Sequence, residues 1–219
     1  MTNPPQLLEA TDLNNDQQLR DSIIEAARSI FDRGLTHGRT GNISVRSGDA
    51  ILVTPTGSSL GTVQADELSL IDANGKHVGG AKPSKEAFLH AAVLRARPQD
   101  SAVVHTHSTY SAAVSCLQHT DTSNVIPPLT AYFAMRVGRL PLLPYHAPGD
   151  SGLEQLAEDT ARENLAMLLS NHGPIVAAKD VPSALDALEE LEETAKLYLL
   201  LHGHTTRPLT TEQAAALAP

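Results

Sequence analysis

Two short turns constrain the fold of this chain more than any other feature of its sequence. A serine–glycine–aspartate turn separates residues 42–46 from residues 50–54, and Asn74-Gly75 separates residues 68–72 from residues 76–78. Glycine beside asparagine or aspartate allows the positive φ angles of a tight hairpin turn, and short runs of this composition are typical of strands. We therefore expect two β-hairpins in the first third of the chain.

Helices are expected between and after these hairpins. Apolar residues recur there at helical spacing, and proline or serine begins several of the segments. The expected helices span residues 19–31, 83–97, 108–117, 153–164 and 182–202, and the further expected strands span residues 102–107, 165–170 and 174–178. Hairpins interleaved with helices predict an α/β domain whose mostly antiparallel central sheet is covered by helices. Residues 1–219 are expected to form this single domain, with residues 1–16 as a loose N-terminal extension.

Composition argues against several classes of protein. The chain has no run of about 18 apolar residues, so we expect no membrane span, and its polar N-terminal segment lacks the pattern of a secretory signal. Cys116 is the only cysteine, which excludes an internal disulfide and fits a reducing, cytoplasmic location. The net charge of −9 argues against a nucleic-acid partner, which requires a basic surface. A small phosphorylated ligand stays compatible, because backbone amides bind phosphate locally.

The strongest signal for chemistry is the segment Val103-Val104-His105-Thr106-His107. Side chains two residues apart on a strand point to the same face, so the rings of His105 and His107 are expected to converge. Two neutral imidazoles on one face form a natural clamp for Zn²⁺ or a similar ion. The alternative is a pair of histidines that bond to carbonyl groups at the end of a sheet.

His172 is a third candidate ligand. It follows an apolar run and lies between Asn171 and Gly173-Pro174, where a tight turn can present it from between two strands. The alternative is a turn histidine in solvent. The other histidines have no such pairing and receive no metal role: His37, His77, His90, His119, His146, His202 and His204.

Glu86 lies in the segment Lys82-Pro83-Ser84-Lys85-Glu86, at the start of an expected helix. A proline near a helix start presets the backbone, and the amides of the first turn have no partner within the helix, so Ser84 and these amides can hold a phosphate. Glu86 can then serve as a general acid or base, or as a further metal ligand. The alternative is a capping serine followed by a glutamate that the helix dipole favours, with Lys85 as a solvated lysine.

Two glycine-bearing turns are further candidates for binding phosphate. They are Thr40-Gly41-Asn42 and Thr54-Pro55-Thr56-Gly57. Threonine hydroxyls, an asparagine amide and exposed backbone N–H groups are suitable phosphate donors, although turns of this composition are common. Neither turn is a P-loop, because no GxxxxGK[ST] pattern occurs in the chain.

These motifs occur in an order that resembles the class II aldolase/adducin family: Thr40–Arg46, Thr54–Gly57, Lys82–Glu86, His105–His107 and Asn171–Gly173. The resemblance covers about residues 20–205 and implies a three-layer α/β/α domain, usually assembled as a tetramer with sites between subunits. It implies that one Zn²⁺, or another divalent ion such as Mn²⁺ or Co²⁺, binds per subunit to His105, His107 and His172. Glu86 matches the family's acid/base residue and is a possible fourth ligand. The positions that match phosphate contacts are Asn42, Thr56, Gly57 and Ser84.

Further segments resemble one subgroup of the family, the 3-oxo-tetronate 4-phosphate decarboxylases. They are Val125–Tyr132, Pro144-Tyr145, Pro148–Asp150 and Glu189–Lys196, together with Lys85, where the sugar-phosphate aldolases usually carry a second serine. The resemblance implies loss of CO₂ from a small phosphorylated sugar acid to leave the ene-diolate of dihydroxyacetone phosphate, with Glu86 handling protons. Lys85 lies beside Ser84 and can meet either the phosphate or the substrate carboxylate; the phosphate is favoured, because neutralising the carboxylate would hinder its loss as CO₂. Tyr132 lies one position out of step with the tyrosine that aldolases take from a neighbouring subunit, so that role is not transferred.

Two other functions are compatible with parts of this pattern. One is another family enzyme, a fuculose-phosphate type aldolase or an epimerase that acts on a phosphorylated ketose. Epimerases tend to place an aspartate where Glu86 lies, and product analysis separates an aldolase from a decarboxylase. The other is a non-catalytic, adducin-like scaffold module. Such modules lack the metal ligands, whereas this chain has all three histidines.

Overall fold

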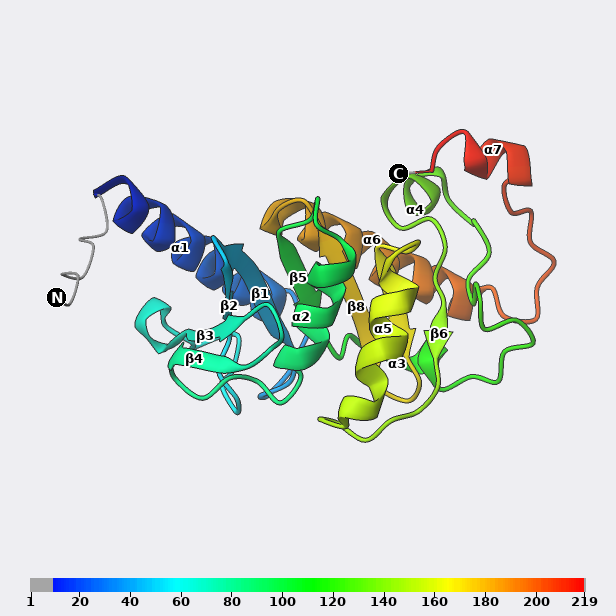
Figure 1. Ribbon diagram of the computed structural model, residues 1–219. Helices are drawn as coiled ribbons and strands as arrows, with labels where there is room; N and C mark the ends of the chain where they lie inside the picture. Colours follow the sequence, from blue (N-terminus) through cyan, green and yellow to red (C-terminus); the bar gives the residue numbers. More distant parts are fainter. Residues whose placement is uncertain (1–9, 219) are drawn as a thin grey trace, which may run out of the picture.

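A single eight-stranded sheet organises the chain in the computed structural model, which describes residues 10–218. The strand order is β4-β3-β2-β1-β5-β8-β7-β6, and Figure 1 shows the sheet running through the middle of the molecule. The strands are β1 (Asn42–Ser47), β2 (Ala50–Val53), β3 (Ser69–Asp72), β4 (His77–Gly80), β5 (Ala102–His105), β6 (Leu142–Leu143), β7 (Ala166–Leu169) and β8 (Gly173–Ala178).

Both predicted hairpins are present. In the first, β1 pairs antiparallel with β2, and the register Ser47↔Ala50 leaves a two-residue turn that Gly48 enters with a φ of 57°. In the second, β3 pairs antiparallel with β4 across the Asn74-Gly75 turn, with one irregularity in register. β1 also pairs with the distant strand β5, and this pairing sets Asn42 opposite His105.

The expectation of a mostly antiparallel sheet needs correction, because the sheet is mixed. β6 joins β7 in parallel at one edge, whereas the pairs within β4-β3-β2-β1-β5-β8-β7 are antiparallel. A parallel pair requires a long crossover connection, and here that connection contains helix α5 (Glu154–Ala161). A strand of two residues, Leu142–Leu143, is too short to show any periodicity, so its sequence gives no sign of it.

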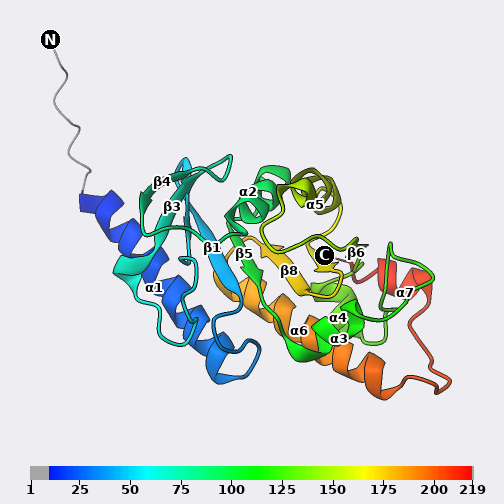
Figure 2. The ribbon, with the colours of Figure 1, turned by 90° about the horizontal axis from the view of Figure 1, so that it is seen from below.

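Helices cover both faces of the sheet. Figure 2 shows α1 and α6 on one face and α2 and α5 on the other. The helices are α1 (Ala10–Asp32), α2 (Ala87–Ala96), α3 (Thr109–Ser115), α4 (Ala131–Arg136), α5, α6 (Val181–Leu200) and α7 (Thr211–Ala215), with 3₁₀ turns at Ala65–Glu67 and Ser151–Leu153. None of them, within residues 10–218, combines the length and the apolar character needed to cross a membrane.

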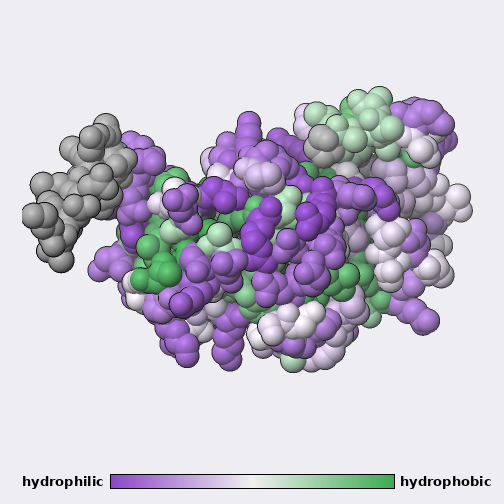
Figure 3. All heavy atoms as spheres, in the orientation of Figure 1, coloured by the Kyte–Doolittle hydropathy of each residue, from purple (hydrophilic) through white to green (hydrophobic). Residues whose placement is uncertain are grey.

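The hydrophobic core follows the alternation of side chains along the strands. Val104 packs with the apolar residues of α1 and α6, whereas its neighbour Val103 packs with those of α2 and α5. Ile43 and Ile175 show the same division between the two faces. The outer surface over α2 and α5 is mainly hydrophilic (Figure 3).

The N-terminal helix is longer than the sequence predicts. α1 begins at Ala10, so residues 10–16, which were expected in a loose extension, are helical; residues 1–9 lie outside the described residues. Arg20 bonds to Asp16 at 2.6 Å and to the carbonyl of Ala65 at 3.0 Å. These polar contacts attach the first turns to the body of the protein without the apolar periodicity that marks the rest of the helix.

The second helix, in contrast, begins later than expected. α2 starts at Ala87 with Glu86 as its N-cap residue, and the preceding segment runs alongside the end of β2 instead. Pro83 forms an isolated bridge with Pro55, and the amide of Ser84 donates to the carbonyl of Thr54 at 3.3 Å. Ser84 therefore belongs to an extended segment and not to the first turn of a helix.

Candidate active site

Three histidines meet at one edge of the sheet. His105 ends β5, His107 follows in the turn to α3, and His172 lies in the turn between β7 and β8. The ring centroids lie 5.0 Å apart for His105 and His107, 4.8 Å for His105 and His172, and 4.4 Å for His107 and His172. One nitrogen from each ring lies within 4.8 Å of the others, so the group could hold a metal ion. The strand ends two residues earlier than predicted, yet the two rings still converge.

Hydrogen bonding determines which nitrogen of His105 faces the cluster. His105 Nδ1 lies 2.8 Å from the carbonyl oxygen of Pro174, which can only accept, so Nδ1 carries the proton. In the neutral ring, Nε2 then presents a lone pair. Among the described residues this buried atom has no hydrogen-bond partner. A buried acceptor without a partner is costly, and a metal ligand of this kind is the usual reason for one, so the residues present fit a divalent ion.

A tight turn presents His172 to the cluster. Asn171 adopts a φ of 57°, which reverses the chain between β7 and β8, and the His172 amide donates to the carbonyl of Leu169 at 3.1 Å. The Nε2 atoms of His172 and His107 lie 2.8 Å apart. Burial lowers the pKa of His107 to about 3 and that of His172 to about 4, and repulsion from His105 acts in the same direction. Both rings are therefore neutral at pH 7, which is the form that binds metal ions.

Glu86 lies beside the three histidines. Its Oε2 lies 3.4 Å from His105 Nε2, and its Oε1 lies 3.4 Å from His172 Nε2. Asn42 Nδ2 donates a hydrogen bond of 2.9 Å to Oε2. Burial acts to raise the pKa of Glu86, but electrostatic interaction with His105 and the bond from Asn42, with smaller contributions from His172 and His90, lower it to about 2. Glu86 is therefore a carboxylate that can accept a proton or approach a metal ion.

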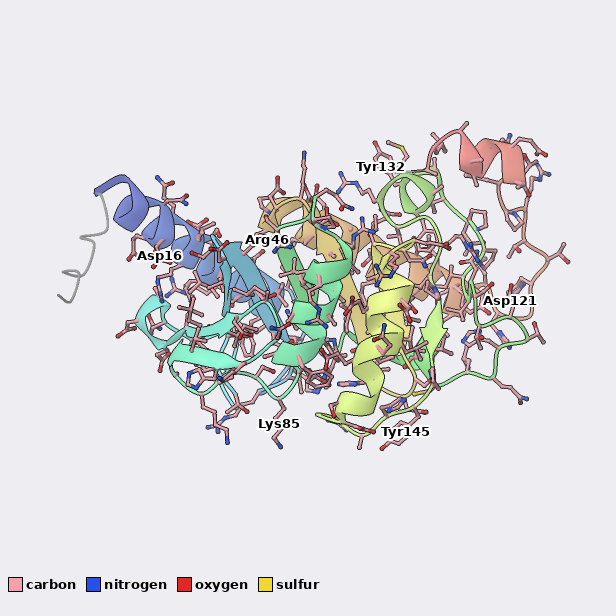
Figure 4. All side chains as sticks on the ribbon, in the orientation of Figure 1. Asp16, Arg46, Lys85, Asp121, Tyr132 and Tyr145 are labelled. Carbon is pink, nitrogen blue, oxygen red and sulfur yellow. The ribbon has the colours of Figure 1, made fainter. Side chains whose placement is uncertain are left out.

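A cavity of about 280 Å³ opens in front of Glu86 and the histidines His107 and His172. The phosphate-binding candidates from the sequence all line it: Asn42, Thr56, Gly57, Ser84 and Lys85. The side chain of Lys85 is exposed and projects at the rim of the molecule (Figure 4). The cavity is thus lined by both groups of residues that the sequence motifs single out.

Hydrogen bonds show which of the phosphate-binding candidates in the cavity lining still have a free donor. The amide of Thr56 donates to the carbonyl of Lys82 at 3.0 Å, so only the Thr56 hydroxyl remains available. The amide of Gly57, which has a φ of 72°, donates to no other group within the described part of the chain. The carboxamide of Asn42 already bonds to Glu86 and His90, so its expected contact with phosphate remains a prediction.

Several residues of this site received no site role from the sequence. Arg39 lines the cavity and directly precedes the Thr40-Gly41-Asn42 turn, so a cation beside a donor-rich turn was an available signal. His90 contacts Asn42 and lies four residues after Glu86, which places both on one side of a helix. Pro148 reaches the cavity from the loop before α5; the sequence singled it out only as part of a segment that resembles the decarboxylases, without a place in the site.

Comparison with known proteins identifies the family of this chain. Residues 21–199 match the family described as Class II Aldolase and Adducin N-terminal domain.

The chain belongs to the class II aldolase and adducin family.

Individual relatives within the family are enzymes of two kinds. A 3-oxo-tetronate 4-phosphate decarboxylase from Escherichia coli is 46% identical over 203 residues, which cover 92% of this chain and 96% of the relative. An L-fuculose phosphate aldolase from Methanocaldococcus jannaschii is 35% identical over 182 residues, which cover 83% of this chain and 96% of the relative. The crystal structure of YgbL from Escherichia coli has a TM-score of 0.89 and 44% identity, covering 94% of this chain and 100% of YgbL.

Tyr132 lies away from the cavity in this member of the family. It is 59% exposed on α4, and Figure 4 shows α4 and Lys85 on opposite sides of the molecule. Tyr132 therefore has no contact with the cavity of its own chain. Its own contact is with Arg136, whose guanidinium lies 5.8 Å from the centre of the ring.

Proposed function

We propose that this chain catalyses the metal-dependent decarboxylation of a 3-oxo-tetronate 4-phosphate to dihydroxyacetone phosphate and CO₂. The observation that carries the proposal is the carboxylate of Glu86, 3.4 Å from His105 and His172, at the wall of a cavity lined by phosphate donors. The identity of 46% to a decarboxylase, against 35% to an aldolase, favours loss of CO₂ over loss of an aldehyde. The proposed activity is that of a carboxy-lyase.

We assign His105, His107 and His172 as ligands of one divalent ion, Zn²⁺ or a similar metal such as Mn²⁺ or Co²⁺. The unpartnered lone pair of His105 Nε2 supports the assignment, as do the low pKa values of the other two rings. Such an ion acts as a Lewis acid that stabilises negative charge on the substrate oxygens. Glu86, whose carboxylate oxygens lie 3.4 Å from His105 Nε2 and His172 Nε2, is proposed as a possible fourth ligand in the resting enzyme.

Glu86 accepts and then donates a proton in the proposed reaction. The substrate carries its carboxylate on C2, which bears a hydroxyl, next to the C3 ketone. Breaking the C1–C2 bond releases CO₂ and leaves the electron pair in an ene-diolate across C2 and C3. Glu86 starts as a carboxylate, so it can accept the proton of the C2 hydroxyl and return it to C2 after CO₂ has left. The net proton that the reaction consumes comes from solvent.

Part of the cavity lining is suited to the phosphate. We assign this contact to the hydroxyls of Thr56 and Ser84, the amide of Gly57 and the ammonium of Lys85, with Asn42 as a further contact. Oriented backbone amides and hydroxyls bind phosphate without a large basic patch, which fits the net charge of −9. Lys85 is assigned to the phosphate because a cation that neutralised the carboxylate would hinder its loss as CO₂.

The proposal extends to the organisation of the chain. We propose a single domain of the three-layer α/β/α type, because helices cover both faces of one continuous sheet. We also propose a homo-oligomer, most simply a tetramer, by resemblance to the family. A non-catalytic scaffold is disfavoured, because Glu86, His107 and His172 line one cavity and His105 lies beside them.

Product analysis tests the proposal. Purified enzyme with Zn²⁺ would be incubated with 3-oxo-tetronate 4-phosphates derived from erythronate and threonate, and both CO₂ and dihydroxyacetone phosphate would be measured. We expect equal amounts of the two products from at least one substrate, and none from a His107→Ala control. An enzyme that releases no CO₂ but splits L-fuculose 1-phosphate into dihydroxyacetone phosphate and an aldehyde would be an aldolase, and the proposal would be wrong.

A further inference from the structure

A buried chain of hydrogen bonds leads from the core to Glu86. His90 is completely buried in α2, one helical turn after Glu86. Its Nδ1 lies 2.7 Å from Ser44 Oγ, and its Nε2 bonds to Asn42 Oδ1. Asn42 Nδ2 then donates to Glu86 Oε2. Asn42 and Ser44 are two residues apart on β1, so both point to the face of the sheet that α2 covers.

The direction of each hydrogen bond in this series follows from the orientation of the Asn42 carboxamide. Its NH₂ group donates to Glu86 Oε2, so its oxygen faces His90. The Asn42 oxygen can only accept, so His90 Nε2 must carry the proton. His90 Nδ1 is then an acceptor, and the hydroxyl of Ser44 donates to it. Every group donates toward Glu86.

We propose that His90 is a positioning residue for Glu86, acting through the carboxamide of Asn42. An asparagine side chain can rotate by half a turn with little change in shape, and that rotation would place its oxygen against the carboxylate. The Nε2–H of His90 prevents this rotation, because it needs an acceptor at that point and no water can reach it. His90 thereby keeps a donor on Oε2 of Glu86, so that Oε1 remains the freer oxygen for proton transfer.

The inference rests on the proposed function of Glu86 as the proton carrier, and it assigns His90 no contact with substrate or metal. Outer partners that orient a reacting or ligating group are typically worth about 10- to 100-fold in activity. A role confined to packing would lower stability but would not act through one particular carboxylate. The two possibilities therefore predict different kinetics in variants of His90.

The test compares two replacements of His90 in the full-length, metal-loaded enzyme. Glutamine places an N–H near the position of Nε2 and can still donate to Asn42, whereas asparagine is too short to reach it. We expect His90→Asn to lower kcat by about 10- to 100-fold with KM nearly unchanged, and His90→Gln to recover most of the loss. Metal content and unfolding temperature are measured on each protein. His119→Asn, a change at a histidine that bonds to the carbonyl of Val114 away from the cavity, is the matched control.

A double-mutant cycle gives the decisive measurement. In a Glu86→Gln background, His90→Asn should change the residual kcat by less than about twofold, because residues that act as one unit are strongly non-additive. The same loss in both backgrounds, or an unchanged kcat in folded, metal-replete His90→Asn, would overturn the proposal.

If His90→Asn does not fold, Ser44→Ala is used in its place. Ser44→Ala removes the hydroxyl that donates to His90 Nδ1, so it should lower kcat in the same way but by less. An unchanged kcat would again overturn the proposal. A wild-type enzyme that releases no CO₂ refutes the proposed function instead, and the cycle can then be run on whichever cleavage reaction it does catalyse.

Discussion

Gly173 lies so close to Thr106 that a Cβ atom built on Gly173 would stand 2.2 Å from the Thr106 carbonyl oxygen and 3.3 Å from the Cα of His107. Only a residue without a side chain allows this approach. The contact brings the first residue of β8 against the turn that carries His107, and the next residue back along the chain is His172. The spacing between two of the candidate metal ligands therefore depends on the absence of one side chain.

Gly173→Ala should separate His172 from His107. The new methyl group meets backbone atoms that cannot move aside cheaply, so we expect a loss of about 1–3 kcal/mol in the free energy of unfolding, together with weaker metal binding. Chemical denaturation and metal titration would measure the two effects. Gly79→Ala is the control, since its Cβ would meet only the side chain of Leu70 at 3.8 Å. Equal behaviour of the two variants would contradict this account.

His107→Ala should remove most of the bound metal and most of the activity. Glu86 is proposed as a fourth ligand beside three imidazoles and does not take the place of a missing ring, so the site loses one of its three nitrogen ligands. Metal analysis after gel filtration would measure the loss, with His146→Ala as the control because His146 bonds to Asp150 and not to the cluster. Full metal content in a folded His107→Ala protein would show that this histidine is not a ligand.

Glu192→Ala should destabilise the protein through α3, the helix that follows His107. Glu192 is buried in α6, and its carboxylate accepts from the backbone amides of Tyr110 and Ser111, each at 2.8 Å. Removing it leaves the buried amide and hydroxyl of Ser111 and the partly buried amide of Tyr110 without this partner, so we expect a cost of about 2–3 kcal/mol in the free energy of unfolding. The neighbouring Glu193→Ala should change stability by about 0.5 kcal/mol or less, because Glu193 is exposed and pairs only with Lys196. Thermal or urea unfolding of the two variants would measure the difference.

Light scattering should show a homo-oligomer, most simply a tetramer. The reason is the resemblance to the family, since the net charge and the lone cysteine carry no information about assembly. The exposed Tyr132 and Tyr145 are suitable reporters, because burial at an interface would protect them from modification. A fully active monomer at micromolar concentration would contradict the expectation.

The convergence of the three candidate ligands was predictable from sequence, because the geometry that produces it is local. His105 and His107 are two residues apart, and His172 lies in a tight turn, so strand alternation and turn chemistry were enough to single them out. The hairpins were predictable for the same reason, because a turn and its two strands are adjacent in the chain.

The parts that were not predictable depend on pairing between distant segments. The register of β1 and β5 sets Asn42 opposite His105, and no local pattern specifies it. The parallel pair of β6 and β7 escapes prediction because a strand of two residues has no period. Pro148 reaches the cavity from a loop of its own, so only the folded structure shows it there.

Glu86→Gln should lower turnover by at least about a hundredfold, because general acid–base catalysis typically contributes about a hundred- to ten-thousandfold. Glutamine keeps the size of the side chain and can still accept the bond from Asn42, but it can neither take nor return a proton. KM should change little, since Thr56, Gly57 and Ser84 still hold the phosphate. Steady-state kinetics would measure both values, with the exposed Glu193→Gln as the control.

The same variant separates two roles for Glu86. A carboxylate 3.4 Å from His105 and His172 can also ligate the resting metal, and loss of that contact would lower metal affinity. Metal content and turnover must therefore be measured on one preparation. Low turnover at full metal content would assign the defect to proton transfer, whereas recovery of turnover on adding excess Zn²⁺ would assign it to metal binding. Near-normal turnover in metal-replete Glu86→Gln enzyme would mean that the proton reaches C2 from another group, and the catalytic assignment of Glu86 would be wrong.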